Sequence, residues 1–224
     1  MVFRLANGDV LLEIKGMTKT FGPVTALDSV DLTVCRGEVR GLIGENGSGT
    51  STLSSIFSGM QGADSGEMKY LGHPWHPRSM EWAMSHGVGM IVQESGTVPG
   101  ITVAENIFLC ETGSFAGGGL VSVRKMRKAA QAALADIGAD GIDAGQIAGM
   151  LDMTERKLVE VAKVWLRRPQ VLVVDESTTS LSQKGREIVY SLMKRLTEAG
   201  GAVVFISHDI DEIKEKCDTL TVLR

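Results

Sequence analysis

The chain has 224 residues, of which 43% are hydrophobic, enough for one large domain or two small lobes. Its formal net charge of −4 gives no electrostatic reason to expect a nucleic-acid or anionic-lipid partner. Three widely spaced cysteines, Cys35, Cys110 and Cys217, fit a reducing compartment better than a disulfide framework. Since no apolar run is long enough to cross a bilayer, we expect a soluble chain.

The first part of the chain alternates strand-like runs with turns. We expect strands at 11–14, 26–34 and 39–43. Phe21 lies in the turn-rich segment between the first two, and its spacing alone favours a core residue at a strand end. The third strand leads into a glycine-rich stretch, residues 44–52, which is followed by three apolar residues at helical spacing, Leu53, Ile56 and Phe57.

A strand, a glycine-rich turn and a helix form the frame of a phosphate-binding loop. Gly44, Gly47 and Gly49 allow a tight turn whose N–H groups converge on an anion at the helix N-terminus. The pattern departs from its usual form because Thr50 occupies the lysine position, although Ser51 still offers a hydroxyl to Mg²⁺. Taken alone, such a loop is equally an ordinary strand-to-helix turn.

The rest of the chain predicts a helical block inserted between strands. A short strand is expected within 62–72, a helix over 76–86 and a buried strand over 87–92. Residues 102–168 then have helical periodicity, with capping boxes at Thr102 and Asp152. The remaining elements are a strand at 171–174, a helix over 184–199 and strands at 202–206 and 219–224. This order predicts an α/β domain with a parallel sheet.

Polar residues directly follow three of the apolar strands. They are Gln93, the pair Asp175-Glu176, and His208. Because ligands of open parallel sheets bind beyond the carboxyl ends of the strands, we expect these residues to meet the glycine loop at one edge. Asp175 could hold Mg²⁺, Glu176 could polarise a water, Gln93 could position the water or metal, and His208 could bond a γ-phosphate. Each one alone is more often structural.

The chain resembles the ATP-binding cassettes of ABC transporters, in particular those that power simple-sugar importers. The resemblance runs from about residue 11 to 224 and rests on TKTFGPVTALDSVDLTV, RGEVRGLIGENGSG, VGMIVQE, ITVAENIFL, LVEVAKVWLRRPQVLVVDE and FISHDIDEI. It implies a P-loop NTPase fold with an N-terminal antiparallel β region. It also implies a nucleotide-binding lobe over 1–94 and 169–224, with an inserted helical subdomain over 95–168.

The resemblance also assigns roles to residues. Phe21 would stack on adenine. Gln93 would form the Q-loop and, together with Ser51 and Asp175, contact the metal. Glu176 and His208 would act with Gln93 in catalysis. Residues 177–181 would form the D-loop. The nucleotide-binding Walker A loop would comprise Gly44, Glu45, Asn46, Gly47, Ser48, Gly49, Thr50, Ser51 and Thr52.

Two departures from the family pattern bear on activity. Thr50 removes the Walker A cation, and the signature, about L-S-G-G-Q in the family, aligns with residues 151–155, where only Leu151 matches. Asp152 and Met153 replace groups that would contact the γ-phosphate bound by a partner cassette. Ser177 replaces the usual proline of the D-loop, which is a smaller change.

The resemblance implies an ATP hydrolase, with ATP and Mg²⁺, that energises import of a sugar or similar solute. Its partners would be a second ABC cassette, transmembrane permease subunits docked near Gln93 and, indirectly, a solute-binding protein, at the cytoplasmic side of the membrane. Nucleic acid is not expected. The strand expected at 219–224 suggests that the chain continues, and the resemblance implies that it is the N-terminal cassette of a tandem protein. The alternatives are a degenerate cassette that binds nucleotide as a scaffold or sensor, and a soluble non-transport ABC ATPase.

Overall fold

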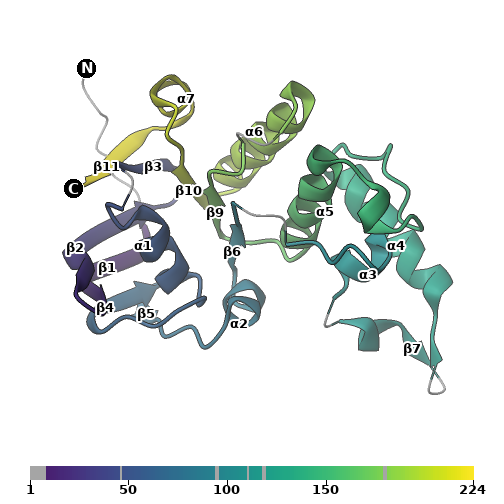
Figure 1. Ribbon diagram of the computed structural model, residues 1–224, viewed down its shortest axis with the longest axis horizontal. Coiled ribbons are helices and arrows are strands. Elements are labelled where there is room, and N and C mark those ends of the chain that lie inside the picture. The colour runs from purple at the N-terminus through teal and green to yellow at the C-terminus, as the bar shows by residue number, and fades with distance from the viewer. Residues whose placement is uncertain (1–8, 46, 94–95, 110, 118–119, 179–180) are drawn as a thin grey trace. The chain divides into compact units, whose positions relative to one another are not determined.

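The computed structural model describes residues 9–45, 47–93, 96–109, 111–117, 120–178 and 181–224 (Figure 1). The chain divides into two compact units, which are described separately. The first contains residues 1–91, 168–176 and 190–224, and the second contains residues 92–167 and 177–189. The division expected from the sequence, 95–168 against the rest, stays a prediction.

An antiparallel sheet forms one layer of the first unit. Its strands are β1 (Val10–Phe21), β2 (Val24–Cys35), β4 (Ser65–Tyr70) and β5 (His73–Pro74), in the order β2-β1-β4-β5. The strands β1 and β2 are longer than their apolar runs predicted, because pairing continues through bulges until Phe21 faces Val24 across a tight turn. The expected N-terminal antiparallel region is therefore confirmed.

A parallel sheet forms the second layer of the first unit. It contains β3 (Val39–Gly44), β6 (Val88–Ile91), β9 (Val171–Asp175), β10 (Ala202–Ile206) and β11 (Thr219–Leu223), in the order β11-β3-β10-β9-β6. Every residue of β9 and β10 is buried, as continuous apolar runs predict for central parallel strands. Ile206 pairs with Leu42 on one side and with Asp175 on the other, so the ends of three strands meet at one edge.

Helices connect and cover these strands. The first unit contains α1 (Thr50–Phe57), α2 (Met80–Ser85) and α7 (Ile210–Lys216), and α6 (Gln183–Glu198) has residues in both units. Helix α1 contacts β2 of the antiparallel sheet and both β3 and β9 of the parallel sheet, with Leu53, Ile56 and Phe57 buried as predicted. Helix α2 begins at Met80 rather than at residue 76, because Pro77 precedes it and the hydroxyl of Ser79 caps the N–H of Trp82.

The second unit is mostly helical, as predicted. Its helices α3 (Val103–Ile107), α4 (Val123–Asp136) and α5 (Met153–Leu166) contact one another, and two 3₁₀ turns lie at Thr112–Phe115 and Ala148–Met150. Two short strands of this unit, β7 (Ala116–Gly117) and β8 (Leu120–Val121), pair antiparallel. In the part of the chain that the structure describes, no helix is both long and apolar enough to span a membrane.

Candidate functional site

The glycine loop after β3 adopts a conformation that only glycine allows. Gly47 and Gly49 have φ angles of +88° and +93°, in the left-handed region. A Cβ on Gly49 would lie 2.3 Å from the carbonyl oxygen of Ala26, so no side chain fits there. Asn46 lies outside the described residues. The loop therefore contains a backbone conformation that requires glycine at these two positions, and the convergence of its N–H groups on an anion stays a prediction.

The loop delivers the N-terminus of α1 without a capping side chain. Gly49 is the N-cap residue, and it has no side chain to accept from the first N–H groups of the helix. The hydroxyl of Ser48 is buried and has no hydrogen-bond partner among the described residues, and the N–H of Ser48 donates to the Glu45 carbonyl at 2.9 Å. The unpartnered Ser48 hydroxyl and the uncapped N-terminus of α1 fit an anion such as a phosphate group.

The first residues of α1 carry hydroxyls rather than a cation. Thr50 begins the helix and is buried, so its short neutral side chain fills the position that the loop pattern gives to lysine. Ser51 and Thr52 follow in the first turn. The positive pole of the helix still favours an anion at this point, but the charge-assisted hydrogen bond of a lysine is missing.

Asp175 ends β9 beside the first turn of α1. Its side chain is buried, and its pKa is raised to about 6 by desolvation and by the charge of Glu176. Hydrogen bonds with the Ser51 and Ser54 hydroxyls and the charge of His208 act in the opposite direction. A carboxylate next to a serine hydroxyl is a donor set that suits Mg²⁺. A bound cation would also relieve the cost of burying this charge.

Glu176 and His208 contact each other at the same edge of the sheet. The Nε2 atom of His208 lies 2.5 Å from the Oε1 atom of Glu176. Glu176 has a φ of +43°, a left-handed conformation that is uncommon for a residue with a long side chain, while its N–H donates to the carbonyl of Ile206 at 3.0 Å. Strained backbone of this kind is often found at functional sites. Two residues predicted to be catalytic are thus brought together.

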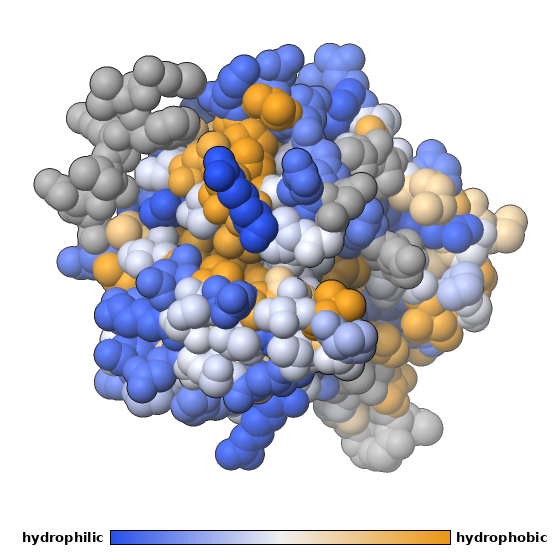
Figure 2. Space-filling view, turned by 60° about the vertical axis from the view of Figure 1, so that its left-hand side comes forward, coloured by the Kyte–Doolittle hydropathy of each residue, from blue (hydrophilic) through white to orange (hydrophobic). Residues whose placement is uncertain are grey.

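A pocket of about 620 Å³ opens beside the glycine loop. Figure 2 shows apolar surface among hydrophilic side chains on one face of the molecule. The pocket is lined by loop residues, by residues that follow β10, and by β11 with the residue after it; they are Ile43, Gly44, Glu45, Gly47, Ser48, Ser207, His208, Ile210, Val222, Leu223 and Arg224. Neither Phe21 nor Ser51 lines it, so the pocket covers only part of the predicted site. Arg224 places a positive charge at its border.

Phe21 is exposed, with 48% of its surface accessible, so its interpretation as a core residue is wrong. It ends β1 at the turn to β2, and the Nζ atom of Lys19 lies 5.5 Å from the centre of its ring. An aromatic ring held in solvent at the end of a strand is available for stacking.

Gln93 and the signature-like segment belong to the second unit. Gln93 is exposed directly after Val92, and its meeting with the glycine loop stays a prediction. Asp152 caps α5: its Oδ1 atom accepts from the N–H of Glu155 at 2.7 Å, and Glu155 bonds back to the N–H of Asp152 at 3.0 Å. The capping box is confirmed at Asp152 and also at Thr102.

Two buried charges in α5 were not predicted from the sequence. Lys157 and Glu160 form an ion pair at 3.0 Å, and their side chains are only 3% and 6% exposed. The apolar positions of α5 predicted one buried face, and nothing in that pattern distinguishes these two residues from solvent-facing ones. The i, i+3 spacing of a lysine and a glutamate is visible in the sequence, but that spacing does not indicate burial.

A comparison with protein families matches residues 27–179 to the family described as "ABC transporter". The ribose import ATP-binding protein RbsA of Chromobacterium violaceum is 39% identical over 211 residues, covering 94% of this chain and 42% of that protein. The arabinose import ATP-binding protein AraG of Rhizobium meliloti is 41% identical over 214 residues, covering 95% and 41% respectively. The chain thus spans less than half the length of these relatives.

Solved structures share the fold. A nucleotide-free ATP-binding cassette from an ABC transporter superposes with a TM-score of 0.80 at 23% identity, covering 96% of this chain and 87% of that one. A dimeric ATP-binding cassette in a post-hydrolysis state, bound to ADP and Pi, also gives 0.80 at 24% identity, covering 96% and 94%.

Proposed function

This chain belongs to the ABC transporter family, and we propose that it is an ATP-binding cassette that energises import of a sugar or similar small polar solute. One observation carries the proposal. A glycine loop with an unpartnered Ser48 hydroxyl, a buried Asp175 and a Glu176–His208 pair all lie in one unit, at the carboxyl edge of one parallel sheet. That arrangement suits phosphoryl transfer from a nucleotide.

The residues present fit ATP and Mg²⁺, with one gap. Backbone N–H groups of residues 45–49 and the Ser48 hydroxyl would hold phosphate oxygens, and Ser51 with Asp175 would hold the metal. When bound, the metal would neutralise charge on the phosphates. Phe21 would stack on the adenine ring. The gap is Thr50, which supplies no cation, and Gly44 and Thr52 would complete the nucleotide-binding segment.

Glu176 would orient the attacking water and accept its proton. His208 holds the Glu176 carboxylate in the present arrangement, and it would donate a hydrogen bond to the terminal phosphate once nucleotide occupies the loop. Gln93 would help position the water or the metal. In-line hydrolysis depends mainly on such positioning, since few covalent steps are left for the protein.

We propose two kinds of partner. A second cassette would complete each nucleotide site with its own signature segment, and permease subunits would bind the second unit and hold the chain at the cytoplasmic side of the membrane. Such docking is supported by three exposed apolar side chains of that unit, those of Val98, Ile147 and Met150. The N–H of Gly149 donates to the carbonyl of Pro99, and this bond joins the segment of Val98 to that of the other two. A solute-binding protein would act through the permease.

A second candidate is a cassette that binds nucleotide but hydrolyses it weakly or not at all. Thr50 favours it, because the loop lacks its cation, whereas the Glu176–His208 pair favours catalysis. The test is to measure Mg·ATP binding and ATP hydrolysis by the full-length protein, with and without its membrane partners. Hydrolysis stimulated by permease supports the transport ATPase, binding without hydrolysis supports the second candidate, and permease-independent hydrolysis supports a non-transport ATPase.

A further inference from the structure

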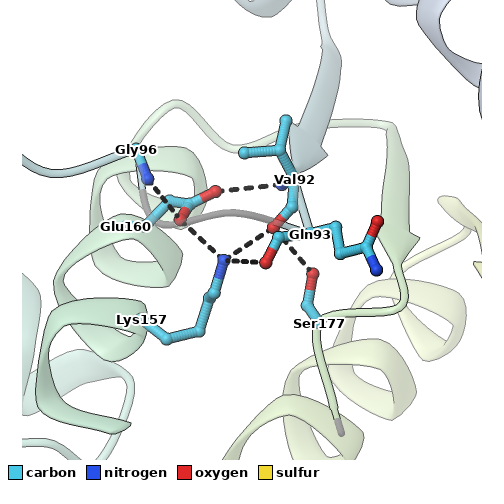
Figure 3. A network of polar contacts seen from close by, with 6 residues as sticks. All are labelled: Val92, Gln93, Gly96, Lys157, Glu160 and Ser177. Carbon is cyan, nitrogen blue, oxygen red and sulfur yellow. Dashed lines mark hydrogen bonds and ion pairs between the residues drawn. The ribbon is translucent and has the colours of Figure 1, made fainter. Parts of the chain in front are cut away.

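Both polar groups of the Val92 peptide are held by side chains far away in the sequence. The N–H of Val92 donates to the Oε1 atom of Glu160 at 2.9 Å (Figure 3). Its carbonyl accepts from the Nζ atom of Lys157 at 2.6 Å and from the Oγ atom of Ser177 at 3.1 Å. Val92 directly precedes Gln93, so these bonds fix the backbone from which the Gln93 side chain extends.

The same two charged residues also hold the backbone on the other side of Gln93. Lys157 donates to the carbonyl of Gln93 at 3.3 Å, and the Oε2 atom of Glu160 accepts from the N–H of Gly96 at 3.1 Å. Figure 3 shows the ammonium and carboxylate groups pointing into this loop, while the amide of Gln93 points away from them. The pair therefore holds backbone groups of Val92, Gln93 and Gly96, and none of these four bonds uses the side chain of Gln93.

Stability is a poor explanation for an ion pair at this place. Two buried charges lose their hydration, and a well-packed apolar pair of similar size is often as stable or more so. An apolar pair could not supply the directional hydrogen bonds that Lys157 and Glu160 make to four backbone groups of Val92, Gln93 and Gly96. The arrangement thus favours a role in positioning backbone.

The ion pair also links the loop to the signature-like segment. Helix α5 begins at Met153, with Asp152 as its cap, and Lys157 lies about one turn further along the same helix. Because a helix is stiff over such a distance, a displacement of residues 151–155 is transmitted to Lys157 and Glu160. From there it reaches the loop that carries Gln93.

We infer that Lys157 and Glu160 are positioning residues that hold Gln93 in a fixed position relative to segment 151–155. Ser177, which bonds to the Val92 carbonyl, extends this coupling to the segment that follows Glu176. The inference rests on the proposed function, since the position of Gln93 affects the reaction only if Gln93 acts on the nucleotide. Gln93 and segment 151–155 therefore move together, so that binding of a partner cassette to segment 151–155 also changes the position of Gln93.

The kinetic test is a double-mutant cycle on the full-length protein, assembled with its partners, with ATP as substrate. We expect Lys157→Met to lower kcat by about 10- to 100-fold, the cost of a small misplacement. The KM for ATP should change less than about threefold, because the glycine loop lies in the other unit. In a Gln93→Ala background, Lys157→Met should produce little further loss, since it acts through Gln93.

Two further variants keep the test decisive if Lys157→Met folds poorly. The pair Lys157→Gln with Glu160→Gln keeps an amide donor for the carbonyls of Val92 and Gln93 and one acceptor oxygen for the N–H groups of Val92 and Gly96, without buried charge, so it should restore part of kcat. Lys194→Met is the matched control: it removes a lysine whose ion pair with Glu198 is exposed, and it should change nothing. Failure of the neutral pair to restore kcat in a folded protein would contradict a role through these hydrogen bonds.

Amide hydrogen exchange gives a readout that needs no catalysis. In the double variant Lys157→Met with Glu160→Met, which removes every side-chain bond from this pair to the backbone, exchange at Val92 and Gly96 should become faster, whereas exchange at Glu105, capped by Thr102 in the same unit, should not change. Additive losses in the cycle, or a KM that rises as much as kcat falls, would overturn the inference. A wild-type assembly that neither binds nor hydrolyses ATP would instead overturn the proposed function.

Discussion

Replacing Asp175 by asparagine should stabilise the protein in the absence of nucleotide and metal. The folded-state pKa of about 6 exceeds the ordinary value of 3.8, so the folded state binds the proton more tightly than the unfolded state. At pH 7.5 the ionised carboxylate therefore costs about 3 kcal/mol of unfolding free energy. Asparagine avoids the charge but loses part of the bonding to Ser51 and Ser54, and we expect a net gain of about 1–3 kcal/mol.

The gain should depend on pH in a defined direction. It should be complete above pH 6, shrink as the pH falls through 6, and vanish below about 3.8, where the carboxyl is protonated in both states. Thermal unfolding between pH 4 and 8 measures it, and a rise in Tm of about 2–10 °C is expected at pH 7.5. Asp211→Asn, at a side chain that is 96% exposed, is the control and should show no such trend.

A second arm of the experiment adds Mg·ATP. The wild-type protein should then gain thermal stability, and Asp175→Asn should gain much less, since a metal ligand is lost. If Asp175→Asn lowers Tm at pH 7.5, or shifts it equally at every pH, the burial cost does not arise from this carboxylate and the reasoning is wrong.

Three further predictions concern the nucleotide site. Thr50→Lys should tighten ATP binding by about 10- to 100-fold in calorimetry, by adding a charge-assisted hydrogen bond; no change would mean that another cation, such as Arg224, already serves the phosphates. Glu176→Gln should leave ATP affinity nearly unchanged but lower kcat by about 10²- to 10⁴-fold in a steady-state ATPase assay. A variant that keeps most of its kcat would exclude Glu176 as the base. Phe21→Ala should weaken ATP binding by about 3- to 10-fold without lowering Tm, because the ring is exposed; a lower Tm with unchanged affinity would indicate a structural ring.

The sequence was sufficient to predict most elements of the fold, because their signals are local. Continuous apolar runs identified β9 and β10, and the glycine loop with Leu53 and Phe57 identified α1. The N-terminal end of α2 was placed too early because Pro77 and Ser79 control where that helix starts, while apolar periodicity begins before them. Phe21 was misplaced from spacing alone, since the tight pairing of strand ends that exposes it involves the partner strand.

The contacts that define the site were harder to predict, because they join distant segments. The sequence directly shows that polar residues follow two apolar strands, namely Asp175 and Glu176 after one and His208 after the other. The contact of Glu176 with His208, and the raised pKa of Asp175, follow only from neighbouring strands in register. Lys157 and Glu160 were missed for the same reason. Their partners are backbone groups more than sixty residues away, and no pattern in α5 records them.

Asp152 has two separable roles, and Asp152→Ser distinguishes them. One is the cap of α5, which serine fulfils as well as aspartate, so unfolding free energy should change by only a few tenths of a kcal/mol. The other is its exposed charge, which in a dimer of cassettes would face the phosphates bound by the partner. Because like charges in a partly desolvated interface cost more than one missing favourable contact, Asp152→Ser should raise the ATPase rate of the assembled dimer more than Thr50→Lys does. Asp152→Asn, a neutral cap of similar shape, should raise it as well. Steady-state rates with the partner cassette present measure both. An unchanged or lower rate at unchanged Tm would leave Asp152 as a helix cap alone.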